Sequence, residues 1–220
     1  MKSVFDIIGP VMIGPSSSHT AGAARLGRLA RKILGEEVRQ VQVKFHGSFA
    51  QTYRGHGTDR AIVAGLLDMA ADDERLPEAL ELAKTAQIEI EFLKCDLGDV
   101  HPNTVCLEMT GRSGRRAEVT GSSLGGGSII VNRINGYQVE LTGEYFTLIT
   151  IHQDKPGIVA LITHILAQAG VNVAFMRVSR SERGAQALLI LEADEPIAES
   201  VYEVVSNLPR IELAMLVPPL

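Results

Sequence analysis

From about residue 144 to its end the sequence follows a regular order of strands and helices, and this order constrains the fold more than any other feature. Strand patterns of apolar residues cover 145–151, 171–178, 185–192 and 211–217, and helical spacing covers 158–169 and 196–208. The 171–178 segment alternates with period two, which predicts a half-buried strand. The order βαββαβ predicts a ferredoxin-like sheet with two helices on one face.

The residues before 144 are richer in glycine and less regular. Helical spacing is found at 20–34, 58–69 and 77–87, and strand patterns at 38–47, 88–92, 105–109, 117–120, 128–131 and 137–141. The pair Asn135-Gly136 between the last two strands is a strong hairpin signal. We therefore expect an α+β domain over residues 1–143, followed by the second domain over 144–220.

Charge and composition exclude several classes of protein. The net charge is −5, aromatic residues make up 5% and tryptophan is absent, which disfavours a nucleic-acid binder. No apolar run reaches the roughly 18 residues of a membrane span, and Asp6 and Gly9-Pro10 interrupt any signal-peptide core. We expect a cytoplasmic protein that uses neither nucleic acid nor membrane.

The chain also lacks a recognisable set of metal ligands. Cys95 and Cys106 are the two cysteines, and two thiolates cannot complete a four-cysteine site. We expect both to be reduced and structural. Asp99 and His101 could offer two ligands, but no carboxylate cluster accompanies them in the sequence. We therefore predict no metal site in this chain.

A run of hydroxyls and an imidazole precedes the first predicted helix. It consists of Ser16, Ser17, Ser18, His19 and Thr20. Backbone N–H groups at a helix start attract anions, and three hydroxyls and an imidazole add donors suited to a small anionic ligand. A helix cap with an exposed histidine explains the same residues equally well. Both readings stay open.

Two further glycine-containing segments carry histidines. His46-Gly47 and His56-Gly57 lie between a predicted strand and a predicted helix, where ligands often bind in α/β architectures. The glycines would allow the backbone to approach a ligand closely, but they could equally serve turns. The segment 121–128 is either an anion-binding nest or a flexible loop between strands.

In the second domain the candidate residues flank the first predicted helix. Asp154, Pro156 and Gly157 form a turn before it, and Asn172 follows Gly170, which ends it. They either bind a small ligand or serve as a helix cap and a turn. Because the two loops lie on opposite sides of the helix, a partner domain would have to bring them together.

Several of these motifs resemble a known family. The runs 3–10 and 13–22, together with 45–49, 55–59 and 125–129, resemble the beta subunit of the bacterial iron–sulfur L-serine dehydratases. The segments 154–157 and 170–173 resemble an ACT domain, which is common to many metabolic regulators. Together these resemblances cover essentially the whole chain.

The resemblance implies deamination of L-serine to pyruvate and ammonia, a reaction of amino-acid catabolism. It implies a [4Fe-4S] cluster whose cysteines belong to a separate alpha subunit. It also implies that His19 acts in proton transfer or positioning, and that a set of neighbouring residues binds substrate: Ser16, Ser17, Ser18, Thr20, His46, Gly47, His56 and Gly57. The ACT domain would form a homodimer and bind an amino acid such as L-serine through Asp154, Pro156, Gly157 and Asn172.

Two other functions are compatible with the same residues. The N-terminal part also resembles the intervening domain of some phosphoglycerate dehydrogenases. The chain could therefore be a purely regulatory binding subunit with no residue in the chemistry, or a detached fragment of such a dehydrogenase. Because a dinucleotide fingerprint is absent from the sequence, the chain is not a dehydrogenase by itself.

Overall fold

The computed structural model describes residues 11–220. The run 3–10, which carries part of the family resemblance, lies outside the described residues. The chain divides into two compact units. One covers the chain up to Gly136 with Glu140–Thr142 and Leu220, and the other comprises Tyr137–Val139 and Gly143–Pro219. We keep a domain boundary between residues 143 and 144 as a proposal, and describe each unit by itself.

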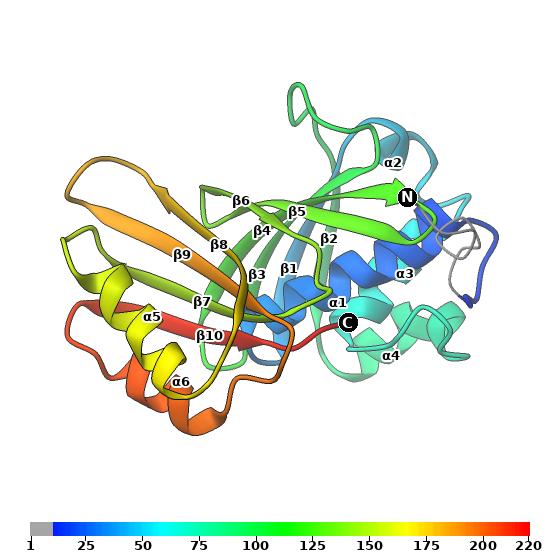
Figure 1. Ribbon diagram of the computed structural model, residues 1–220. Helices are drawn as coiled ribbons and strands as arrows, with labels where there is room; N and C mark the ends of the chain where they lie inside the picture. Colours follow the sequence, from blue (N-terminus) through cyan, green and yellow to red (C-terminus); the bar gives the residue numbers. More distant parts are fainter. Residues whose placement is uncertain (1–10) are drawn as a thin grey trace. The chain divides into compact units, whose positions relative to one another are not determined.

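The first unit is built on a six-stranded sheet with the strand order β2-β1-β3-β4-β5-β6 (Figure 1). Strands β1 and β2 are parallel, and β3 runs antiparallel to β1. The strands are β1 (Val38–Phe45), β2 (Glu89–Lys94), β3 (Thr104–Gly111), β4 (Arg116–Gly125), β5 (Ser128–Ile134) and β6 (Tyr137–Leu141). The helices are α1 (Ala23–Leu34), α2 (Gly47–Thr52), α3 (Thr58–Leu66) and α4 (Ala79–Thr85), the last preceded by a 3₁₀ turn at Leu76–Glu78.

Helices α1 and α3 pack closely because glycines lie at their contact. A Cβ atom added to Gly27 would come within 2.2 Å of the Ile62 carbonyl oxygen, and one added to Gly65 within 2.1 Å of the Ala24 carbonyl oxygen. Leu26, Leu29 and Ile33 on α1 are buried in the core. The close helix pair holds fixed the two segments that begin α1 and α3, where the candidate site residues lie.

The second unit has the predicted βαββαβ order, which is confirmed. Its elements are β7 (Phe146–Gln153), α5 (Ile158–Gln168), β8 (Val173–Arg180), β9 (Gln186–Ala193), α6 (Glu199–Ser206) and β10 (Ile211–Val217). The strand order is β10-β7-β9-β8, and both helices lie on one face of the sheet (Figure 1). Leu148, Leu189 and Leu191 of the sheet pack with Ile162 and Leu166 of α5 in one core.

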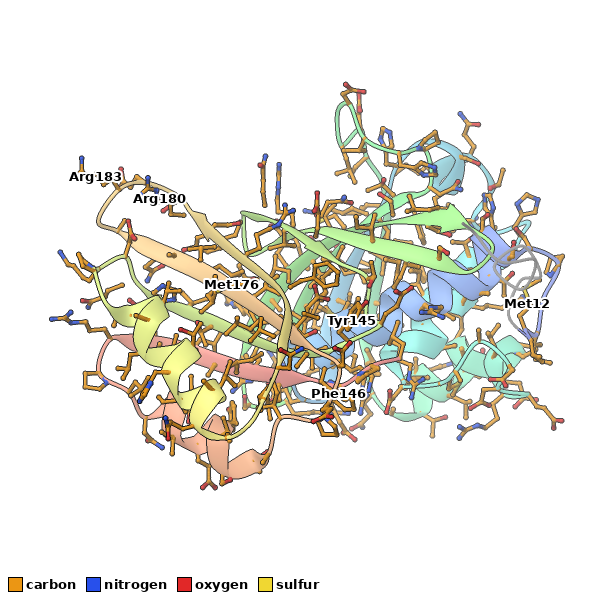
Figure 2. The ribbon with its side chains drawn as sticks, viewed as in Figure 1. Met12, Tyr145, Phe146, Met176, Arg180 and Arg183 are labelled. Atoms are coloured by element: carbon orange, nitrogen blue, oxygen red, sulfur yellow. The ribbon has the colours of Figure 1, made fainter. Side chains whose placement is uncertain are left out.

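Strand β8 differs from its prediction. The alternation at 171–178 predicts a half-buried strand, but Phe175 is 56%, Met176 52% and Val178 45% exposed. The reason is its place at the edge of the sheet, where β9 is the only strand that pairs with it in the described part of the chain. Figure 2 labels Met176 on this strand. An edge strand with large apolar side chains is a surface that another strand can cover.

The first unit differs from prediction at three places. The helix expected from residue 20 begins with a π-helical turn, η2 (Ser17–Gly22), because the N–H of Ala21 reaches back five residues to the Ser16 carbonyl. The short helix α2 was not predicted. The segment 121–128 is not a loop: β4 continues to Gly125 and pairs with β5, so only Gly126 and Gly127 form the turn.

Among residues 11–220, no helix has both the length and the apolar character needed to cross a membrane.

Candidate functional site

The start of η2 places His19 in a cluster of polar side chains. Ser16 is the N-cap of η2, and its backbone is extended. The His19 backbone N–H donates to Ser16 Oγ over 3.1 Å. The predicted serine cap is therefore present, and it fixes the backbone of His19, whose ring faces Ser48 and His56.

Three segments of the first unit meet at the His19 ring. Its Nε2 lies 3.2 Å from Ser48 Oγ, and its Nδ1 lies 3.5 Å from Ser16 Oγ. The rings of Phe49 and His56 contact it edge to face, with centroids 5.2 Å and 4.8 Å away. We call Ser16, His19, Ser48, Phe49 and His56 the histidine cluster. It joins the starts of η2, α2 and α3.

The electrostatic setting keeps the His19 imidazole neutral. Burial lowers the pKa of His19 below its ordinary value, and the neighbouring His56 lowers it further. A neutral imidazole has one nitrogen that accepts a proton. His19 is thus able to act as a base at neutral pH.

His46 takes part in the same region as the N-cap of α2. The Leu97 N–H donates to its Nδ1 over 3.1 Å. Asp96 lies 3.6 Å from the same atom, but an ion pair would need a proton on Nδ1, where the Leu97 N–H already binds. The neutral form therefore carries its proton on Nε2, which is a donor for a ligand.

Gly47 lets the backbone at the start of α2 pass close to the loop before β3. Its φ is +52°, and an added Cβ would lie 2.7 Å from the Pro102 carbonyl oxygen. The Phe49 N–H also donates to that oxygen. This close approach fixes the position of α2, and with it Ser48 and Phe49.

We expect Gly47→Ala to destabilise the chain by about 2–4 kcal/mol, because it adds both backbone strain and a steric clash. Gly57→Ala is the matched control. Gly57 also has a positive φ, +69°, but an added Cβ would meet nothing within 4 Å, so only about 1 kcal/mol of strain is expected. Calorimetric melting of the two variants is the measurement. Equal losses would contradict the close contact with Pro102.

The remaining predicted residues of this region differ in their surroundings. Ser17 and Ser18 are half-buried, and a Cβ added to Gly125 would lie 3.7 Å from Ser18 Oγ, so the β4–β5 turn lies beside the serines. Thr20 is buried, and its Oγ1 has no hydrogen-bond partner among the described residues. The Oγ atoms of Thr58 and Ser123 share this property. Unpaired buried hydroxyls are costly and uncommon in folded proteins.

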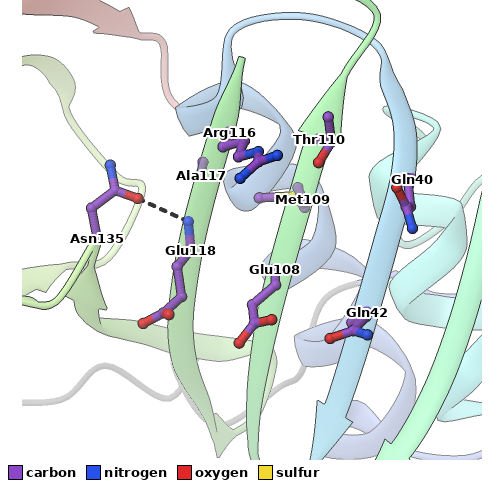
Figure 3. Close-up of a pocket in the computed structure, with 9 residues that line it drawn as sticks. All are labelled: Gln40, Gln42, Glu108, Met109, Thr110, Arg116, Ala117, Glu118 and Asn135. Atoms are coloured by element: carbon purple, nitrogen blue, oxygen red, sulfur yellow. Dashed lines mark hydrogen bonds between the residues drawn. The ribbon is translucent and has the colours of Figure 1, made fainter. Parts of the chain in front are cut away.

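The open face of the six-stranded sheet holds a different group of polar residues. A cavity of about 350 Å³ lies there. Figure 3 shows residues that line it, with Glu108 and Glu118 side by side on β3 and β4. Ligand atoms of Cys106, Glu108 and Glu118 lie within 4.8 Å of one another. Lys44 donates a hydrogen bond to Glu108, and burial raises the pKa of the Cys106 thiol, which keeps it protonated. We therefore assign no metal to this group.

In the second unit the predicted effector residues lie at the two ends of α5. Gly157, with φ +92°, is its N-cap, whereas the exposed Asn172 follows its C-terminal end. Asp154 does not cap the helix. Its Oδ2 accepts hydrogen bonds from the Gly184 N–H, over 3.0 Å, and from Arg180, over 3.3 Å. As expected, one copy of this unit does not bring Gly157 and Asn172 together.

Sequence reasoning missed Ser48. It stands in the run 45–49, next to two of the predicted residues, but its contact with His19 spans 29 positions. The only signal for it was the presence of a hydroxyl directly after His46-Gly47.

Comparison with known proteins supports the family resemblance of both parts of the chain. Residues 3–89 match the family described as "Serine dehydratase beta chain", and residues 146–210 match "ACT domain". The chain is 47% identical to the probable L-serine dehydratase, beta chain, of Bacillus subtilis (strain 168) over 210 residues, 96% of this chain and 95% of that one. It is 37% identical to the L-serine dehydratase, beta chain, of Peptoniphilus asaccharolyticus, covering 96% of each.

A more distant similarity links the chain to another enzyme class. It is 25% identical to the D-3-phosphoglycerate dehydrogenase of Synechocystis sp. over 191 residues, which is 86% of this chain and 34% of the dehydrogenase. The ACT match covers only 146–210, so this alignment also includes part of the first unit.

Proposed function

The chain belongs to the L-serine dehydratase beta-chain family, and from this premise we propose that it completes, with a separate alpha subunit, an enzyme that deaminates L-serine to pyruvate and ammonia. The observation that carries the proposal is the histidine cluster. It presents a neutral imidazole next to serine hydroxyls at the start of a helix. This is an arrangement suited to a small amino-acid substrate.

An iron–sulfur cluster does not fit the cysteines of this chain. Cys106 lies in β3 and Cys95 directly follows β2, and β1 runs between these two strands. A [4Fe-4S] cluster needs more thiolates than these two supply. We propose that the alpha subunit holds the cluster, and that this chain contributes binding and proton transfer.

In this proposal the substrate carboxylate binds at the start of η2. The hydroxyls of Ser17 and Ser18 would donate hydrogen bonds to the carboxylate. The Ser16 hydroxyl orients His19 by accepting a hydrogen bond from the His19 backbone N–H. The His46 Nε2–H, together with His56 and Gly57 at the start of α3, would contact the other side of the substrate. Thr20 would support the turn from within, because it is buried. His19 would accept a proton at a ring nitrogen.

This proposal is tested by comparing the chain alone with the chain combined with an alpha subunit. The chain purified alone under anaerobic conditions should be colourless and release no pyruvate from L-serine. Together with an alpha partner it should form a brown, active, oxygen-sensitive complex. Stoichiometric iron in the isolated chain, or an alpha subunit that is fully active without it, would overturn the division of labour.

A purely regulatory subunit is the second candidate. The similarity to phosphoglycerate dehydrogenase over 86% of the chain favours it, because that similarity extends beyond the ACT domain into the first unit. The two candidates differ in whether His19 affects turnover.

For the second unit we propose a homodimer that binds a small amino acid, L-serine. The exposed apolar residues of β8 support pairing of two copies along this edge. Gly157 and Pro156 of one copy would then bind the ligand together with Asn172 of the other. Asp154 would act mainly by holding the 181–184 turn through Gly184.

A further inference from the structure

Among residues 11–220, Ser48 is the one side chain outside the predicted set that contacts a ring nitrogen of His19. Their atoms lie 3.2 Å apart, and Ser48 Oγ has no other hydrogen bond among the described residues. It is half-buried at the start of α2. The ring of the next residue, Phe49, is fully buried and contacts Phe45. Ser48 is therefore held on a rigid support.

The hydrogen bonds around His19 favour one tautomer. Ser16 Oγ already accepts the His19 backbone N–H, so its own hydrogen is available for Nδ1, 3.5 Å away. Nε2 then carries the ring proton and donates it to Ser48 Oγ. In this arrangement the ring proton makes the shorter of the two hydroxyl contacts, and Nδ1 is the nitrogen with the longer contact.

We propose that Ser48 is a positioning residue that holds His19 in its Nε2–H tautomer and leaves Nδ1 as the atom that accepts a proton. This inference rests on the proposed function, which it deepens by naming the reacting nitrogen. The contacts of Phe49 and His56 with the faces and edges of the ring restrict its rotation, but they do not distinguish the two nitrogens. Only hydroxyl contacts can do so.

The first experiment reads the tautomer without relying on catalysis. In the full chain labelled with ¹⁵N-histidine, NMR should show neutral His19 protonated on Nε2. Ser48→Ala should produce a mixture of tautomers and lower the pKa of His19 further, because the lost bond is stronger when the ring is charged. Ser48→Thr should restore the wild-type spectrum. A His19 protonated on Nδ1, or a spectrum unchanged by Ser48→Ala, would overturn the proposal.

The second experiment measures turnover in the assembled enzyme. Ser48→Ala should lower kcat about 10-fold, with a smaller effect on KM, and Ser48→Thr should recover most of it. Thr52→Ala is the matched control, since it removes a hydroxyl from the same short helix and only a bond to the Ser48 carbonyl. Equal losses in Ser48→Ala and Thr52→Ala would show that the helix, and not the hydroxyl, matters. If His19 proved unnecessary for turnover, the NMR result would still decide whether Ser48 sets the tautomer of His19.

Discussion

Replacing His19 with alanine is expected to lower kcat of the assembled enzyme by about 10²-fold or more, because positioned general bases contribute 10²–10⁴-fold. The loss should be in kcat and kcat/KM together, which is the sign of an interaction made in the transition state. A role confined to binding would instead raise KM. Steady-state kinetics on the complex, with its iron content checked, is the measurement.

His164→Ala provides a matched control for this variant. His164 is an exposed histidine on α5 of the other unit, so its loss changes composition in the same way without touching the histidine cluster. If His19→Ala leaves both kcat and KM unchanged in a correctly assembled complex, the serine run is a helix cap and the regulatory candidate is favoured.

The pH dependence follows from the direction of the His19 shift. The pKa of His19 is lowered, mainly by burial, so the neutral form persists below the ordinary range of histidine. Activity that needs the neutral imidazole should therefore be kept at pH values where a solvated histidine is already charged, and be lost as the pH falls through the lowered pKa. A kcat/KM profile whose acid limb has an apparent pKa above 6.5 would contradict this assignment.

Local patterns in the sequence predicted much of the architecture. The period-two and helical spacings placed every strand and helix of the second unit, because elements of both the sheet and the helices contribute apolar side chains to the same core. The serine cap at Ser16 was also readable, since it acts over three residues. Features decided by distant contacts were not. Helix α2 depends on Gly47 passing Pro102, and the exposure of β8 depends on strand order.

The histidine cluster also combines features that local patterns predict with features that distant contacts decide. Ser16, His19 and His56 were named from the motifs at 16–20 and 56–57, but the motifs did not say that His19 would contact Ser48 and His56. That meeting requires α1 and α3 to pack together, with Gly27 and Gly65 at their contact. The sequence thus indicated the chemistry of the site, and the packing of the helices determined which groups meet.

A charge placed on β8 should separate the proposed dimer. Phe175 is 56% exposed on the edge strand, so Phe175→Glu would bury an unpaired charge if two copies pair there. The expected cost of about 3–5 kcal/mol corresponds to more than 100-fold weaker association. Val204→Glu is the control, since Val204 is 51% exposed on α6, which packs against β10 at the edge of the sheet opposite β8. Sedimentation of the full chain should show monomers for the first variant and dimers for the second.

Binding of an amino acid by the second unit should then depend on that dimer. Because one copy holds Gly157 and Asn172 at opposite ends of α5, a helix of 11 residues that is about 16 Å long, a ligand that contacts both must lie between two copies. Such a ligand stabilises the dimer and can make activity sigmoidal in L-serine. Gly157→Val, which forces a β-branched residue to φ +92°, and Asn172→Ala should both flatten this response while iron content stays unchanged. Calorimetry of the full chain with L-serine is the direct measurement, and Phe175→Glu should abolish the heat of binding. If the wild-type chain is monomeric and no amino acid binds at millimolar concentration, the second unit serves assembly with the alpha subunit and not regulation.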